Sequence, residues 1–280
     1  MVRLLGPLVG LFFVVALLWS LISGAAAFIA EPPEETVEHA FHKHPKDVHF
    51  TSDGPFGRFD EQQLQRGFQV YREVCAACHS LRLVAFRDLV ALGYNEPEVK
   101  AIAASFQVPG IDPNTGEVTT RPGLPTDYFP KPYPNDVAAA AANNNAIPPD
   151  LSLMTKARHD GSAYVYSLLT GYQSQPAELV RRFPDARTPQ GLYYNPYFPN
   201  LNLAMAPPLT TEGQVTYGDG TRPTVSQMAK DVSAFLVWSA EPKLEKRHQT
   251  GWVVVLFLIV MTVLIYLAYQ HVWRGIKGNH

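Results

Sequence analysis

The amino-acid sequence predicts a mainly α-helical fold with long irregular insertions and one C-terminal transmembrane helix. Apolar residues recur at helical spacing over residues 60–75 and 224–240, which predicts two amphipathic helices. Residues 107–149 and 184–223 are rich in Pro, Gly and Asn, as turns and loops are. Residues 252–269 form an uncharged apolar run long enough to cross a bilayer. The remaining length of the 280-residue chain fits a single domain with insertions.

The first amphipathic helix is expected to begin near Asp60. Asp60 and Gln63 have the spacing of a capping box. Leu64, Phe68 and Tyr71 then follow at helical spacing. This helix should therefore present the two cysteines of the chain on its last turn.

Those cysteines, Cys75 and Cys78, are followed directly by His79. The pattern C-x-x-C-H is typical of c-type haem attachment, in which the cysteines form thioethers and the histidine ligates the iron. A redox dithiol or a chance buried pair is a second interpretation, but it needs no adjacent histidine and usually lies in a βαβ context. Half of a zinc site is a third, but the chain has no second cysteine pair to complete it. The motif favours one covalently bound haem c.

The middle of the chain is expected to be irregular. Its composition excludes a regular sheet or a long helix over residues 107–149, apart from a short helix in the alanine run at 138–145. Short helices are expected over 150–157 and 162–170, separated by Asp160-Gly161. The last helix of the domain should then cover 224–240, with an apolar stripe formed by Val225, Met228, Val232, Phe235 and Leu236.

A low-spin haem needs a sixth iron ligand, for which methionine and histidine are the usual choices in electron transfer. Met205 is favoured, because it lies in "LNLAMAPPLT", where Pro207-Pro208 would brace a rigid loop. Met154 and His159 are the alternatives. Core packing is the expected role of Met228, and Met261 lies within the apolar run.

Both ends of the chain are expected to meet a membrane. Residues 1–27 have a short positive region at Arg3, an apolar run and an A-x-A cleavage pattern, which predicts a signal peptide. An uncleaved anchor is the alternative, and either version exports the following residues. The segment 250–273 predicts a transmembrane helix with interfacial aromatic residues at both ends. A short cytoplasmic tail, 274–280, carries Arg274 and Lys277.

The exported region has an acidic balance. Residues 31–240 contain 23 acidic and 17 basic side chains, a net charge of −6, which would steer a basic soluble partner. Residues 28–57 are expected to form an extended, solvated arm. His39, His42 and His44 in this arm could bind a metal, but solvation is the simpler interpretation.

Several segments carry a family resemblance. Gly67, Tyr71 and the pattern "DVSAFL" resemble the helix-crossing residues of class I cytochromes c, with Val232 and Phe235 as the packing pair. The wider pattern resembles the cytochrome c1 family, through "RGFQVYREVCAACHSLRLVAFRDLV", "DYFPKPYPN", "PPDLSLMTKARHDG", "YVYSLLTGY", "GLYYNPYFPN", "AMAPPL" and "MAKDVSAFLVWSAEP" in that order.

The resemblance implies a class I cytochrome c-like haem domain over residues 58–245, with His79 and Met205 as axial ligands. It also implies a haem pocket formed by Asn143, Ala146, Pro149, Arg158, Tyr164, Leu168, Leu169, Phe198, Leu203 and Pro208. Arg158 would pair with a haem propionate, whereas without the family it reads as a solvated arginine. The chain lacks a disulfide that some bacterial members have near the methionine, so its loop would be held by packing alone.

The resemblance further implies an electron carrier of the respiratory or photosynthetic cytochrome bc1 complex, a quinol–cytochrome c oxidoreductase. The haem would accept one electron from the Rieske iron–sulfur subunit and pass it to a soluble or tethered cytochrome c. Cytochrome b, the lipid bilayer and a dimeric complex are implied as well, and no nucleic acid. The haem domain would lie in the periplasm on the inner membrane. A tethered electron donor outside such a complex and a haem peroxidase are the alternative functions.

Overall fold

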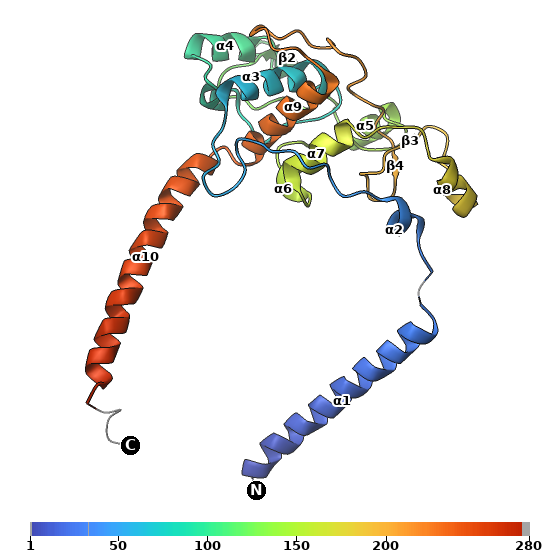
Figure 1. The fold of residues 1–280 in the computed structure, drawn as a ribbon. Coiled ribbons are helices and arrows are strands. Elements are labelled where there is room, and N and C mark those ends of the chain that lie inside the picture. Colours follow the sequence, from blue (N-terminus) through green and yellow to red (C-terminus); the bar gives the residue numbers. More distant parts are fainter. Residues whose placement is uncertain (1, 33, 276–280) are drawn as a thin grey trace. The chain divides into compact units, whose positions relative to one another are not determined.

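The computed structural model describes residues 2–32 and 34–275 (Figure 1). The chain divides into two units, and the boundary along the sequence falls between His42 and Lys43. The first unit contains the long apolar helix α1 (Val2–Ala30) and the short helix α2 (Val37–Phe41). Thr36 caps α2 by accepting a hydrogen bond from the His39 amide. The predicted extended arm therefore contains one short helix.

The second unit is built around the crossing of α3 (Glu61–Val70) and α9 (Val225–Ala240), which Figure 1 shows packed together. A Cβ atom on Gly67 would lie 2.1 Å from the Asp231 carbonyl oxygen, so only glycine permits this approach. Val232 and Phe235 are fully buried at the crossing, and the Phe235 ring lies 5.7 Å from the ring of Tyr71. The expected packing of the first and last helices is confirmed.

The start of α3 differs in one detail from the expected capping box. The Asp60 side chain accepts a hydrogen bond from the Gln63 amide, as predicted. The Gln63 side chain, however, donates across the helix crossing to Asp231 at 3.1 Å. A buried carboxylate on α9 needs donors more than the exposed first turn does, so the second half of the box is not formed.

Residues 71–75 form a π-helical turn, η1 (Tyr71–Cys75), which the sequence pattern did not predict. The Ala76 amide donates to the Tyr71 carbonyl at 2.8 Å and closes the wider turn. Such turns are rare and recur at functional sites. The helix delivers Cys75 at its end, with a wider last turn than an α-helix has, but Cys78 lies in the turn that follows, so the expectation of both cysteines on the last helical turn is only half right.

The first insertion contains η2 (Phe86–Leu92), α4 (Glu96–Ala104) and the antiparallel strands β1 (Gln107–Ile111) and β2 (Val118–Pro122). The expectation of no regular sheet over 107–149 is therefore wrong. The Asp112 side chain accepts a hydrogen bond from the Asn114 amide, and Gly116 has a φ of +74°. Together they turn the chain between the two strands. Two hydrogen bonds from Arg121 to Asp127 fix the chain after β2.

The second insertion carries the short elements between the strand pair β1–β2 and helix α9. These are α5 (Asp136–Ala142), α6 (Met154–Ala157), α7 (Gly161–Leu169), α8 (Ala177–Arg182), η3 (Pro184–Ala186), β3 (Tyr193–Tyr194) and β4 (Asn202–Leu203). Helix α7 agrees with the helix expected over 162–170, and α5 covers the alanines of the expected helix at 138–145 but ends at Ala142. The helix expected over 150–157 is shorter, because the Asp150 side chain binds backbone amides instead of continuing a helix.

Among the residues that the structure describes, two helices are long and apolar enough to cross a membrane: Leu5–Ala30 within α1, and α10 (Leu244–Trp273). The second begins before the predicted segment 250–273, since Leu244 is buried against the domain and starts the helix there. The chain is a membrane-anchored, mainly α-helical protein. Lys277 of the predicted tail lies outside the described residues.

Candidate haem-binding site

The two cysteines and the histidine lie on one tight turn that begins at Cys75, the last residue of η1. The Cys78 and His79 amides both donate to the Cys75 carbonyl, at 3.1 and 2.9 Å. Both thiols are free. Burial, and to a smaller extent the nearby Cys78, raises the pKa of the Cys75 thiol to about 12, so this thiol is protonated at neutral pH.

The His79 ring is oriented by a backbone carbonyl. Its Nδ1 lies 2.8 Å from the Pro149 oxygen, and because a carbonyl only accepts, Nδ1 carries the proton. Nε2 then keeps its lone pair. Burial lowers the pKa of His79 and outweighs the opposing effects of the Pro149 carbonyl and of Asp150. A neutral imidazole with one nitrogen held by a carbonyl is the form that ligates metals.

Asp150 fixes the segment that supplies this carbonyl. Its carboxylate accepts from the Ser80 hydroxyl at 2.8 Å and from the amides of Arg82 and Ser152 at 2.9 and 3.0 Å. Burial opposes ionisation of Asp150, but these hydrogen bonds outweigh it and lower its pKa. The chain on both sides of the His79–Pro149 contact is thus held by one charged group. This role of Asp150 was not predicted, although Asp and Pro are both residues that favour turns.

The methionine loop, residues 204–214, is held by hydrogen bonds as well as packing. The Tyr172 hydroxyl donates to the Met205 carbonyl at 3.0 Å. The Gln214 side chain accepts from the Thr210 amide at 3.0 Å and donates to the Pro208 carbonyl at 2.7 Å. The expectation of a loop held by packing alone is therefore wrong. No local pattern marks Gln214 or Tyr172, because their partners are backbone atoms.

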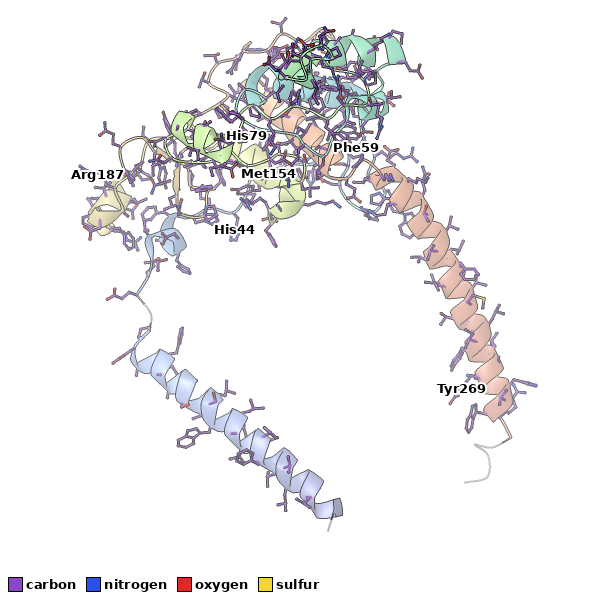
Figure 2. All side chains as sticks on the ribbon, turned by 180° about the vertical axis from the view of Figure 1, so that it is seen from behind. His44, Phe59, His79, Met154, Arg187 and Tyr269 are labelled. Carbon is purple, nitrogen blue, oxygen red and sulfur yellow. The ribbon has the colours of Figure 1, made fainter. Side chains whose placement is uncertain are left out.

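The other candidates for a sixth ligand lie in different surroundings. Met154 is on α6 and packs, half-buried, against the hydrophobic core, within the body of the domain in Figure 2. The His159 side chain is 96% exposed and pairs with Asp160 at 3.0 Å. Met228 is fully buried in the core and Met261 lies in α10. Among these methionines, Met205 alone lies outside a helix.

Of the residues implied as the pocket, Pro149 lies at this turn, through its contact with His79. Pro149 contributes its carbonyl, and Tyr164 is buried on α7. The other apolar residues of the implied pocket are half-buried: Ala146, Leu168, Leu169, Phe198, Leu203 and Pro208. Asn143 is half-buried and donates to the Ala139 carbonyl at 2.7 Å. A cavity of about 240 Å³ adjoins Cys78, with Tyr133 and Pro149 among its lining residues.

Arg158 is exposed, and its guanidinium donates to the neighbouring Ala157 carbonyl at 3.4 Å. Within residues 2–32 and 34–275, no carboxylate lies within ion-pair distance of it. It also lies close enough to Tyr164 to lower that hydroxyl's pKa, although burial of Tyr164 raises the pKa overall. An exposed guanidinium beside the Tyr164 hydroxyl, with no carboxylate paired to it among the described residues, is free to pair with an added carboxylate such as a propionate. Two thiols, an imidazole with a free Nε2, a loop thioether and this cation together fit a haem c.

The alternative of a site for a free metal ion finds no complete set of ligands among the described residues. In the part of the chain that the structure describes, no three His, Cys, Asp or Glu side chains converge in a way that could hold a metal ion. The zinc interpretation of Cys75 and Cys78 therefore has no further ligands there. The same holds for His39, His42 and His44.

Comparisons with known proteins point to one family. The family model described as the cytochrome C1 family matches residues 50–276. Cytochrome c1 of Rhodospirillum rubrum is 46% identical over 233 residues, which cover 80% of this chain and 85% of that protein. The mitochondrial cytochrome c1 haem protein of Saccharomyces cerevisiae is 46% identical over 228 residues, covering 81% and 72%. Cytochrome b/c1 of Bradyrhizobium diazoefficiens is 41% identical over 269 residues, covering 91% of this chain and 39% of that longer protein.

Proposed function

This chain belongs to the cytochrome c1 family, the haem subunits of cytochrome bc1 complexes, and we propose that it carries single electrons from a Rieske iron–sulfur subunit to a cytochrome c. The observation that carries the proposal is the turn Cys75–His79, with the Nδ1 of His79 on the Pro149 carbonyl. This turn offers two free thiols and one ligating nitrogen within five residues of a hydrogen-bonded backbone. Family membership itself implies a haem cofactor.

In this proposal, Cys75 and Cys78 hold one haem c through thioethers, and His79 and Met205 occupy the axial positions. The bound haem supplies a one-electron iron couple. The protein supplies the rest: Pro149 fixes the imidazole, the methionine loop fixes the thioether, and Arg158 compensates a propionate charge. Apolar pocket walls exclude water, and a methionine ligand keeps the potential high. No covalent bond to a substrate is made by this chain.

The proposed topology follows from the two apolar helices. Residues 1–27 direct export and are removed, 28–57 form the arm, 58–245 the haem domain, and 250–273 the membrane span. The haem domain then lies in the periplasm, on the inner membrane, and residues 274–280 in the cytoplasm. Trp252 near one end of the span, and the contact of Tyr269 with Trp273 at the other, have the positions of interfacial aromatic residues.

The proposed partners are the other subunits of the complex and a soluble or tethered cytochrome c. A relative named cytochrome b/c1 supports an association with cytochrome b, and we expect the complex to be dimeric. The net charge of −6 over residues 31–240 supports a basic acceptor, because opposite charge raises the association rate.

The test is stopped-flow oxidation of the quinol-reduced complex by a basic cytochrome c at several salt concentrations, with an acidic cytochrome c as control. Screening shortens the Debye length from about 30 Å at 0.01 M to about 10 Å at 0.1 M salt, so the rate with the basic acceptor should fall steeply. A rate that is flat with salt would refute a basic acceptor. A protein that purifies without cytochrome b, or whose reduced haem binds small ligands readily, would favour a separate donor or a peroxidase.

A further inference from the structure

A loop of the haem domain runs along the first two turns of the membrane helix. We call residues 54–59 the interface loop. The Phe59 amide donates to Glu245 at 2.8 Å, the Gly57 carbonyl lies 3.3 Å from Nδ1 of His248, and the Pro55 carbonyl accepts from Nε1 of Trp252 at 3.2 Å. Phe59 is labelled beside the start of α10 in Figure 2. The contacted positions of α10 are spaced by three and four residues and share one helix face.

The interface loop has a defined backbone. Gly54 has φ +76°, which favours glycine. A Cβ on Gly57 would lie 2.1 Å from the Ser52 carbonyl oxygen. The Arg58 amide donates to Thr51 at 2.8 Å and the Gly57 amide to Gly54 at 3.2 Å. The loop therefore presents the side chain between Pro55 and Gly57 in one place.

That side chain is Phe56, whose ring stacks on Trp252. The ring centroids are 4.9 Å apart and the planes differ by 7°. Phe56 is nevertheless 74% exposed and Trp252 45% exposed, so the pair forms an apolar surface instead of a buried contact. Trp252 is also the residue at which the polar start of α10 gives way to the apolar run 252–269.

We propose that the interface loop docks on the lipid bilayer, with the Phe56–Trp252 pair at the level of the headgroups, as a second membrane contact of the haem domain. Arg58, Lys243 and Lys246 are exposed near this pair in sequence and would meet lipid phosphates. Aromatic residues favour this depth because one part of their surroundings is apolar and the other wet. The contact would fix the height and tilt of the domain above the membrane.

The bilayer is favoured over a protein partner for two reasons. The stacked pair adjoins the residues that cross the bilayer, so once α10 spans the membrane, Trp252 reaches the headgroup region without further chain movement. The exposed Arg58, two residues from Phe56, matches anionic lipid, whereas a protein groove would need its own complementary charge. The inference rests on α10 being the membrane anchor and is independent of the electron route proposed above.

The test places the photoreactive residue p-benzoylphenylalanine, which keeps the shape of phenylalanine, in the full chain within its native membranes. Three positions are compared. Phe56→p-benzoylphenylalanine tests the inference. Val118→p-benzoylphenylalanine is the matched control, since Val118 is an 88% exposed apolar residue on β2. Met261→p-benzoylphenylalanine reports on the span of α10 itself.

After illumination, mass spectrometry of the haem-stained chain identifies the adducts. We expect phospholipid adducts at positions 56 and 261, with a yield at 56 severalfold above that at 118. A protein adduct at 56 would overturn the inference in favour of a subunit contact. Lipid adducts at 261 with none at 56 would overturn it and leave the anchor intact. An absence of lipid at 261 would overturn the anchor and the inference together, while haem spectra of the same samples test the electron-carrier function separately.

Discussion

The imidazole of His79 and the carbonyl of Pro149 form a 2.8 Å contact between segments that are far apart in the sequence. The contact sets the tautomer of the ring and directs Nε2 away from the backbone that holds Nδ1. Asp150, next to Pro149, binds both the Ser80 hydroxyl and the Arg82 amide, so the two segments cannot slide past one another. An iron ligand held in this way needs little reorganisation when the metal changes its charge.

Replacement of Gly67 should disrupt the helix crossing. In Gly67→Ala, the new methyl group would lie 2.1 Å from the Asp231 carbonyl oxygen and 2.7 Å from Cβ of Phe235, so the helices must separate. Overpacking of this kind should cost about 3 kcal/mol in the free energy of unfolding. Thermal unfolding of the haem-loaded protein measures it, with Gly218→Ala as control, since nothing lies within 4 Å there. Equal melting temperatures for the two variants would contradict the assigned packing.

Arg158 should influence the haem through its charge. Arg158→Gln removes a cation beside the proposed propionate and should lower the midpoint potential, because the ferric state gains relative stability. A change of about 1 kcal/mol in the free-energy difference between the ferric and ferrous states corresponds to about 40 mV for one electron. Redox titration measures this shift, and Arg181→Gln, an exposed arginine on α8, is the control. A potential unchanged from wild type would argue against any propionate contact.

Gln214 should keep the methionine loop in place. Gln214→Ala removes two hydrogen bonds to loop backbone atoms and should cost about 1–2 kcal/mol of loop stability. The thioether-to-iron charge-transfer band should then be lost at a lower temperature than in wild type. Gln190→Ala, at an exposed position, should leave the band unaffected. If both variants lose the band at the same temperature as wild type, Gln214 does not hold the loop.

Glu241 should make the junction of α9 and α10 sensitive to acid. Burial raises the pKa of Glu241, but hydrogen bonds from Arg247 and Lys156 outweigh it, and the folded-state pKa is lowered from the ordinary 4.5. Its stabilisation is therefore fully present above about pH 4.5 and is lost as the pH falls through the lowered value. The Glu241→Gln variant should be less stable than wild type at neutral pH, and the difference in free energy of unfolding should shrink as the pH falls. Thermal unfolding at a series of pH values measures this difference. Glu178→Gln, exposed on α8, is the control; a deficit that is constant with pH would contradict the assignment.

Local patterns in the sequence predicted the elements whose signals are local. Thr224 caps α9 by accepting a hydrogen bond from the Gln227 amide, and the apolar stripe of that helix is buried apart from the half-buried Val225, because both depend on spacing within one segment. Asp60 likewise begins α3. The apolar run of α10 needed no partner to be recognised. The motif C-x-x-C-H and the proline-braced loop supplied the candidate ligands His79 and Met205, and the family resemblance added the pocket residues.

The remaining features depend on partners that no local pattern in the sequence specifies. The side chain of Gln63 is drawn to Asp231 by a buried charge that no local pattern reveals. The strands β1 and β2 pair although their composition favours turns, since Pro109 and Gly110 are tolerated in a two-stranded ribbon. Tyr172 and Gln214 bind backbone carbonyls, which every sequence offers equally. The π-helical turn before Cys75 was missed for the same reason, because it differs from an α-turn by a single carbonyl partner.

The most direct test of the proposed haem ligation is the charge-transfer band between a methionine thioether and ferric iron, recorded for wild type, Met205→Leu and Met154→Leu. The account predicts that the band is present in wild type and in Met154→Leu, and that Met205→Leu loses it with a fall in midpoint potential. Haem should stay covalently bound in all three, as peroxidase staining of a denaturing gel would show. A band that survives in Met205→Leu and disappears in Met154→Leu would contradict the account.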